Sequence, residues 1–207
     1  QVVEALATCG DTAAAIPLLK ILEGEGKDEK LAALRALEPI VDRRAIQPLL
    51  PVLTDKDPEL RLMGIRILGR LRAGEATPTL LSFLKSEEGE TRREAVVALG
   101  KIGDPKVGRA LLPLLSLPEE DIRRTTLNTL AMLRPLDLVP ELVSLAAKRT
   151  EETGRRALAL DALAAILRGR GAGAHSKPLC ELAQGESYTL ATAALTVMAA
   201  SGDPAFG

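Results

Sequence analysis

Apolar residues recur along this chain with a period of about 31 positions, which is much longer than any single helix or strand. The repeat is clearest when the chain is aligned on the leucine of the segment "ALG", Leu99. The matching positions are Leu6, Leu37, Leu68, Leu99, Leu130, Leu163 and Met198. Successive members lie 31, 31, 31, 31, 33 and 35 residues apart. Such regular spacing is the sequence signature of a repeat architecture.

The columns beside this anchor predict an amphipathic helix, here called helix A. Apolar residues also stand three positions before the anchor, at Val3, Leu34, Ile65, Val96, Leu127, Leu160 and Leu195. Small residues stand four positions before it, at Ala33, Gly64, Ala95, Thr126, Ala159 and Ala194. Positions −4, −3, 0 and +3 share one face of an α-helix. The small column therefore predicts that a neighbouring helix approaches closely.

A second helix, here called helix B, is predicted after each helix A. Pairs of apolar residues recur twelve and thirteen positions after the anchor, at Leu18–Leu19, Leu49–Leu50, Leu80–Leu81, Leu111–Leu112 and Leu142–Val143. Proline stands early in several of these segments, where its missing N–H costs little. Each unit therefore reads as helix, tight turn, helix and short loop.

One such helix pair cannot bury its apolar stripe alone, but stacked neighbours can. The sequence therefore predicts an all-α, right-handed α-solenoid of about six to seven stacked helix-pair repeats, with about 13 helices. We expect a single domain over 1–207, excised from a longer protein. The expected repeats are 1–27, 28–56, 57–88, 89–118, 119–150, 151–186 and a partial repeat at 187–207.

Two long segments carry a family resemblance. "DPELRLMGIRILGRL" (57–71) and "ETRREAVVALGKIGDPKVGRALLPLL" (90–115) resemble the HEAT-like repeat family, in the short bacterial form found in phycobilisome lyase subunits. The resemblance covers essentially the whole chain. It implies a scaffold for protein partners, with the B helices on the concave side of the solenoid. Because the pattern specifies a fold and no chemistry, it does not imply one particular partner.

Composition narrows the function further. The core is almost wholly aliphatic, since Phe83, Phe206 and Tyr188 are the only aromatic residues, and the net charge is −1. No basic excess or aromatic surface favours nucleic acid, so that partner is not expected. No run of about 18 apolar residues predicts a membrane span, and no signal peptide is visible, so a cytoplasmic location is expected.

Enzyme chemistry is not expected. One histidine and two cysteines, Cys9 and Cys180, offer neither a histidine-rich metal site nor a Cys–His pair. The prediction is therefore a protein without catalytic residues, metal or cofactor. An accessory subunit of a lyase or modifying enzyme remains a weaker alternative.

The turn between helices A and B also has a structural explanation. In "IGDP", Gly103 can end helix A with a positive φ, and Asp104 can cap the next helix. Gly10 and Gly202 share the first position, and Asp11, Asp42 and Asp203 share the second. Repetition of this turn argues against a unique phosphate-binding loop.

Two polar columns mark the start of helix A. A basic column lies seven positions before the anchor, at Lys30, Arg61, Arg92, Arg123 and Arg156. An acidic column lies two positions earlier, at Asp28, Glu59, Glu90 and Asp121. The acids complement the helix dipole, and the arginines can bridge neighbouring units through carboxylates or carbonyl groups. An anion-binding groove lined by Arg61, Arg92 and Arg123 is the alternative.

The predicted partner-binding surface is the outward stripe of the B helices. Its members are Lys20, Gln47, Pro51, Thr79, Ser82, Arg109, Pro113, Glu141, Ser144, Lys177 and Glu181. Most are small, neutral or proline, and few are charged. Such a groove suits a peptide or a partner helix better than a polyanion. A merely solvated face is the alternative explanation.

The segment "ILRGRGAGAHSKP" (166–178) breaks the repeat. It contains Arg168, Arg170 and His175, and residues 148–177 together carry an excess of four positive charges. Insertions in repeat proteins often form functional loops. The alternative function is therefore binding of an anionic ligand or nucleic acid by this loop and the arginine column. We also expect the apolar end faces to contact missing neighbouring repeats or to associate end to end.

Overall fold

A computed structural model describes residues 15–202 of the protein except 25, 41, 170–175 and 185–186. The all-α prediction is confirmed: these residues form twelve α-helices and several short 3-10 segments, with no strand among them. The chain divides into two compact units, Gln1–Asp104 and Pro105–Gly207, which are described separately.

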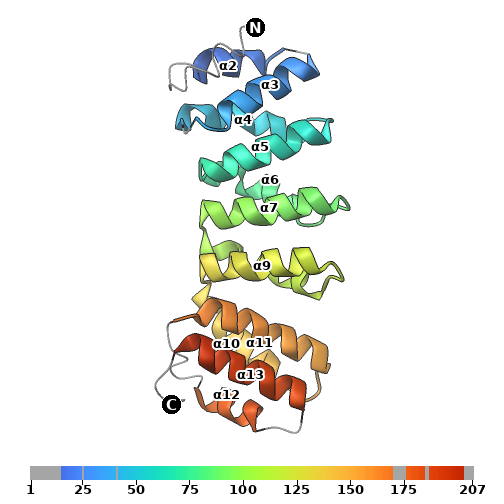
Figure 1. The fold of residues 1–207 in the computed structure, drawn as a ribbon, viewed down its shortest axis with the longest axis vertical. Coiled ribbons are helices and arrows are strands. Elements are labelled where there is room, and N and C mark those ends of the chain that lie inside the picture. Colours follow the sequence, from blue (N-terminus) through green and yellow to red (C-terminus); the bar gives the residue numbers. More distant parts are fainter. Residues whose placement is uncertain (1–14, 25, 41, 170–175, 185–186, 203–207) are drawn as a thin grey trace. The chain divides into compact units, whose positions relative to one another are not determined.

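In the first unit, three A helices lie side by side and the B segments connect them (Figure 1). The A helices are α3 (Lys27–Leu37), α5 (Pro58–Arg70) and α7 (Gly89–Ile102). The B segments are α2 (Ala15–Ile21), then η2 (Arg43–Ala45) with α4 (Ile46–Leu49) and η3 (Leu50–Thr54), then η4 (Gly74–Ala76) with α6 (Thr77–Phe83).

The second unit repeats this pattern. Its A helices are α9 (Glu120–Leu133), α11 (Thr153–Leu167) and α13 (Tyr188–Ser201). Its B segments are η5 (Pro105–Val107) with α8 (Gly108–Leu111) and η6 (Leu112–Ser116), η7 (Leu136–Leu138) with α10 (Val139–Ala147), and α12 (Ser176–Ala183). The A helices of both units begin at 27, 58, 89, 120, 153 and 188, which reproduces the spacing of the apolar columns.

The small residues that stand four positions before the anchor are buried. Ala33, Ala95, Thr126 and Ala194 have no exposed surface, and Gly64 is also buried. A Cβ on Gly64 would lie 3.1 Å from Cγ1 of Val52 in the preceding B segment. These small residues therefore let the B segment pack directly against the backbone of helix A.

Neighbouring A helices also approach closely at a second point. A Cβ placed on Gly69 of α5 would lie 2.9 Å from the Cα and Cβ atoms of Ala98 in α7. Real side chains do not tolerate that distance, so the packing of α5 on α7 requires glycine at this position.

The B segments are less regular than the repeat pattern predicts. Two of them change from α-helix to 3-10 helix at an internal proline, at Pro51 and at Pro113. Proline has no N–H to donate, and its ring clashes with the carbonyl group four residues earlier. The tighter 3-10 turn removes this conflict. The prediction treated both prolines as surface positions and missed this consequence.

The A–B turn is left-handed in both units, as the glycines predicted. Gly103 has φ +85° and Gly202 has φ +63°. Arg72 and Arg134 occupy the same position of their repeats, with φ +51° and +48°. At Arg72, the N–H donates to the Gly69 carbonyl at 3.1 Å, and the next N–H donates to the Leu68 carbonyl at 3.0 Å. This bonding is a Schellman motif, which normally places glycine there.

The capping prediction is confirmed at Asp42. The Asp42 side chain accepts the N–H of Arg44 at 2.9 Å and caps η2. Asp11, Asp203 and Gly10 lie outside the described residues.

Because a left-handed conformation strains an L-residue, Arg134→Gly is expected to stabilise the protein by about 0.5–1 kcal/mol. The matched control is Arg124→Gly, an exposed position inside α9, where glycine should destabilise by about 1 kcal/mol. Urea unfolding measures both effects. Equal destabilisation by the two changes would show that Arg134 carries no strain.

Candidate functional site

The side chains of the predicted B-helix stripe reach the surface. Thr79 is half-buried, and the other ten members are exposed. The structure brings only some of them together. Arg109, Pro113 and Glu141 line one cleft, whereas Pro51 and Glu181 each line a different cleft. Lys20, Gln47, Thr79, Ser82, Ser144 and Lys177 contribute to none of these three clefts.

The largest of the three clefts lies in the second unit and has a volume of about 500 Å³. It runs between the B segment of α8 and η6, helix α10 and the start of helix α11. Leu112, Leu145 and Leu158 are half-buried and form an apolar floor. Pro113 and Ser116 stand exposed beside them. The cleft therefore offers aliphatic surface that water still reaches.

Charges at the rim of this cleft are already paired. Arg109 Nη2 lies 2.9 Å from a carboxylate oxygen of Glu141, which joins two members of the predicted stripe across neighbouring repeats. Arg155 Nη1 lies 2.9 Å from Glu151 Oε2, and Lys148 Nζ lies 2.8 Å from Glu151 Oε1. The lysine bond is the main cause that lowers the pKa of Glu151. The Arg109–Glu141 pair carries no net charge, whereas Glu151 faces two cations, so this group keeps one net positive charge beside the leucine floor.

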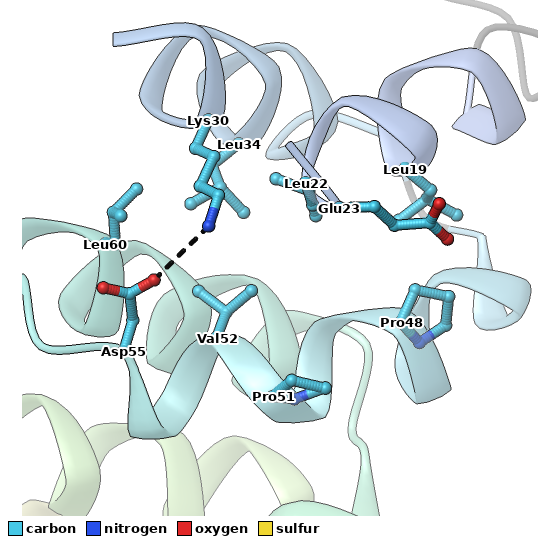
Figure 2. A pocket seen from close by; sticks show the side chains of 10 residues that line it. All are labelled: Leu19, Leu22, Glu23, Lys30, Leu34, Pro48, Pro51, Val52, Asp55 and Leu60. Atoms are coloured by element: carbon cyan, nitrogen blue, oxygen red, sulfur yellow. Dashed lines mark ion pairs between the residues drawn. The ribbon is translucent and has the colours of Figure 1, made fainter. Parts of the chain in front are cut away.

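A second cleft, of about 270 Å³, lies in the first unit. Figure 2 shows Leu22, Leu34 and Val52 pointing toward one another between α2, α3 and η3. Lys30 and Asp55 form an ion pair at one end, with Nζ and Oδ2 3.7 Å apart. This cleft again combines an aliphatic interior with a paired charge.

A third cleft, of about 310 Å³, lies near the end of the second unit. Arg149, Arg156 and Glu181 line it together with Leu182 and Leu190. Nε of Arg156 donates to the Ala146 carbonyl at 2.7 Å, so this arginine also has a structural task.

Sequence reasoning missed the leucines that floor the main cleft. In each apolar pair of the B helices, the first member is buried, as at Leu111. The second member is only half-buried at Leu50, Leu81 and Leu112. For Leu112 the doubled leucines were a usable signal, because two successive residues point in different directions from the helix axis. Both members are nevertheless buried at Leu142 and Val143, and Leu145 and Leu158 belong to no such pair.

The arginine column performs the bridging role that was predicted for it. Nη1 of Arg61 donates to the carbonyl groups of Asp55 and Lys56 at 3.0 and 2.9 Å, and Nη2 donates to Glu88 at 2.9 Å. Arg92 donates to the Ser86 carbonyl at 2.7 Å. Arg123 donates to the carbonyl groups of Leu117 and Pro118 at 3.0 and 3.2 Å.

These arginines therefore bind the chain where each B segment leads into the next helix A. All three are half-buried. Because their donors already bind carbonyl groups, this geometry favours the structural role over an anion-binding groove. The anion-binding alternative also included the loop 166–178. Arg168 of this loop is exposed, while Arg170 and His175 lie outside the described residues.

Glu88 fixes the position of Arg61, a member of the arginine column. It accepts a 2.8 Å hydrogen bond from the Thr91 hydroxyl and an ion pair from Arg61. These two contacts, with Thr91 the larger cause, lower the pKa of Glu88 below its ordinary value of 4.5. The carboxylate therefore joins α5 to α7 within the first unit.

Neither a metal site nor a membrane-spanning helix is found in the part of the chain that is described. No group of three or more histidine, cysteine, aspartate or glutamate side chains there is placed to hold a metal ion. No described helix has both the length and the apolar character needed to cross a bilayer. Cys180 is a free thiol and is half-buried.

The described residues form a helical-repeat protein whose B segments line three clefts. The predicted resemblance is confirmed for the middle of the chain, because residues 46–131 match the family described as HEAT repeats. No curated protein matches this chain.

Solved structures share the fold at low identity. The complex of CpcE and CpcF of phycocyanin lyase from Nostoc sp. PCC7120 is 21% identical, with a TM-score of 0.57 over 96% of this chain and 88% of that one. A designed armadillo repeat protein in complex with the peptide (KR)4 is 18% identical, with a TM-score of 0.57 over 90% and 98%.

An engineered protein is also similar, at 21% identity and a TM-score of 0.56. The match covers 96% of this chain, which spans 60% of the length of that protein. At these identities the likeness shows the fold alone, which is a HEAT- or armadillo-like helical repeat.

Since the pKa of Glu88 is lowered on folding, its carboxylate stabilises the protein above pH 4.5, and this contribution is lost as the pH falls through the lower folded value. Glu88→Gln is therefore expected to lower the urea midpoint at pH 7, and its difference from the unaltered protein is expected to shrink as the pH falls below 4.5. Glu87→Gln is the control, because Glu87 is exposed and has no ion pair among the described residues. A pH-independent difference for Glu88→Gln would contradict this assignment.

Proposed function

We propose that this chain is a non-catalytic scaffold that binds a partner protein or peptide through the surface of its B segments. The observation that carries the proposal is the cleft floored by Leu112, Leu145 and Leu158. Its volume of about 500 Å³ is within the range of binding clefts, and its walls come from rigid helices. Aliphatic side chains of a partner would displace water from half-buried leucines, which is favourable because it buries apolar area.

The charges around the cleft restrict the chemistry of the partner. Arg109 and Arg155 stand at the rim, and each has a carboxylate partner. A basic peptide would meet two guanidinium groups there, so (KR)4, the ligand of the designed armadillo protein, does not suit this cleft. A segment with aliphatic anchors and neutral or acidic neighbours fits better. Such a segment can bury its apolar side chains and leave the ion pairs intact.

The rest of the surface supports the same choice. The arginines of helix A bind backbone carbonyl groups, so they are not available as a polyanion site. Exposed A-helix charges also pair between repeats, as Arg35 does with Glu59 at 3.1 Å and Arg66 with Glu90 at 3.4 Å. These contacts join neighbouring repeats, as the Arg109–Glu141 pair also does at the rim of the cleft, which leaves the half-buried leucines as its accessible apolar surface.

Selection from a displayed peptide library tests the proposal, because a library samples many side-chain combinations at once and the binding sequences identify the preferred chemistry. We expect enrichment of peptides with two or more aliphatic residues. Their affinity should fall at least tenfold on Leu145→Lys, which places a charge in the cleft floor, and on Ser116→Arg, which narrows the cleft at an exposed position.

Met132→Lys is the matched control, since Met132 is an exposed apolar residue of the same unit that does not line the cleft. Circular dichroism confirms that each variant folds. Equal loss of affinity for Met132→Lys, or unchanged affinity for both cleft variants, would overturn the proposal.

A further inference from the structure

The first cleft, of about 270 Å³, and the third, of about 310 Å³, occupy equivalent places in their repeats. Counted from the repeat anchors, Pro48 and Val52 of the first cleft correspond to Pro178 and Leu182 of the third. Each cleft is lined by the B segments of two successive repeats, and both have aliphatic walls. This equivalence allows their charged residues to be compared position by position.

The two clefts differ in charge at equivalent positions. In the first cleft, Nζ of Lys30 and Oδ2 of Asp55 lie 3.7 Å apart, and Glu23 adds a second acid, which leaves one net negative charge (Figure 2). Counted from the anchors, Arg156 corresponds to Lys30, and Arg149 corresponds to Glu23. Both arginines line the third cleft. A base therefore replaces an acid at one of the two positions and remains at the other.

The third cleft also has a neutral residue where other repeats have an acid. Four A helices follow an acidic N-cap residue, at Asp57, Glu88, Glu119 and Glu152. Glu88 pairs with Arg61 of the preceding A helix, with Oε2 and Nη2 2.9 Å apart. The N-cap residue of α13 is Ser187, which lines the third cleft beside Arg156. A serine hydroxyl carries no charge, so it cannot neutralise Arg156 as Glu88 neutralises Arg61.

Both arginines therefore keep donors for a ligand. Arg156 is half-buried, and its Nε donates to the Ala146 carbonyl at 2.7 Å, which positions the side chain. The two Nη atoms of Arg156 have no hydrogen-bond partner among the described residues. Arg149 is exposed and has neither a hydrogen bond nor an ion pair of its side chain in the described part of the chain. Guanidinium groups with open donors suit a carboxylate, which can accept two hydrogen bonds from one of them.

We propose that the third cleft binds an acidic side chain of a partner peptide, whose carboxylate is held by Arg149 and Arg156. An aliphatic neighbour of that acidic residue contacts Pro178 and Leu182. Glu181 also lines the cleft, so its charged residues carry one net positive charge, which a single carboxylate neutralises. A phosphate group carries more negative charge and is repelled more strongly by Glu181. The volume of about 310 Å³ is at the lower end of the range for ligand clefts, which suits a short peptide segment.

This site is separate from the cleft of the proposed function. The two clefts share no lining residue. Leu145 lines the larger cleft and not this one, so Leu145→Lys distinguishes failure of one proposal from failure of the other.

Differential selection from a displayed peptide library tests the proposal. Peptides are selected on the unaltered chain and then depleted on Arg149→Glu, which reverses one charge at an exposed position. We expect the retained peptides to carry aspartate or glutamate beside an aliphatic residue. In a synthetic peptide of this set, replacing the acid by its amide should lower the affinity at least tenfold. The amide peptide should no longer distinguish the unaltered chain from Arg149→Gln, because the two changes remove the same contact.

Ser187→Glu is the most direct variant, because it restores the acid that the other A helices have. Glutamate already occupies the N-cap position of α7, α9 and α11, so the variant is expected to fold. Its carboxylate should pair with Arg156 and lower the affinity for the acidic peptide at least tenfold. Glu181→Gln should raise the affinity, because it removes the acid that repels the ligand.

Arg124→Gln is the matched control, because Arg124 is an exposed arginine of α9 that lines none of the three clefts. This variant and Leu145→Lys should bind the acidic peptide as tightly as the unaltered chain does. Circular dichroism spectra of all variants are compared with that of the unaltered chain to verify the fold.

Any of four results would overturn the proposal. Depletion on Arg149→Glu could leave no acidic peptide. Ser187→Glu could bind the peptide unchanged, which would exclude Arg156 from the site. Arg124→Gln or Leu145→Lys could lose as much affinity as the cleft variants, which would indicate general charge attraction or binding in the larger cleft. Inorganic phosphate could displace the peptide at an equal concentration, which would identify a phosphate site instead.

Discussion

Each helix pair of this protein has an apolar surface that only a neighbouring pair can cover, and the rest of the structure depends on that contact. The contact requires close approach, so alanine, glycine or threonine recurs where helices meet. Gly69 against Ala98 is the sharpest case, because even a methyl group at Gly69 would collide with the backbone of the next helix. In a repeat protein with an aliphatic core, the packing of neighbouring repeats therefore depends on the shape and spacing of small side chains and not on large aromatic ones.

The polar groups are arranged around this contact. The carbonyl groups that follow the end of a B segment lie outside any helix, and an arginine from the following helix A donates to them. Acidic residues near the start of the next helix complete the join, as Glu88 does for Arg61. The electrostatics of helix A therefore serve cohesion between repeats. The B side is left with clefts of half-buried leucine, which is why the proposed binding surface lies there.

The sequence was sufficient for the period, the helix pairs and most of the buried columns, because one face of a helix must repeat every 3.6 residues. It also indicated the bridging role of the arginines. It did not indicate that Pro51 and Pro113 would convert their helices to 3-10 geometry, although an internal proline is a readable signal. The cleft could not be predicted from the sequence, since Arg109 and Glu141 are 32 positions apart and meet only because neighbouring repeats stack. Leu195 was predicted to be buried, and that prediction is wrong, because the side chain is 53% exposed. Periodicity predicts which residues share a face and cannot say whether a neighbour covers that face.

The central claim is that the leucine-floored cleft of the second unit receives a partner segment. Hydrogen–deuterium exchange, measured with and without a selected peptide, tests it most directly. The account predicts slower exchange in η6 and along α10, whose backbones frame the cleft, and unchanged exchange in the exposed turn at Arg134. Protection confined to that turn, or to the first turns of the A helices, with none in η6 or α10, would contradict it.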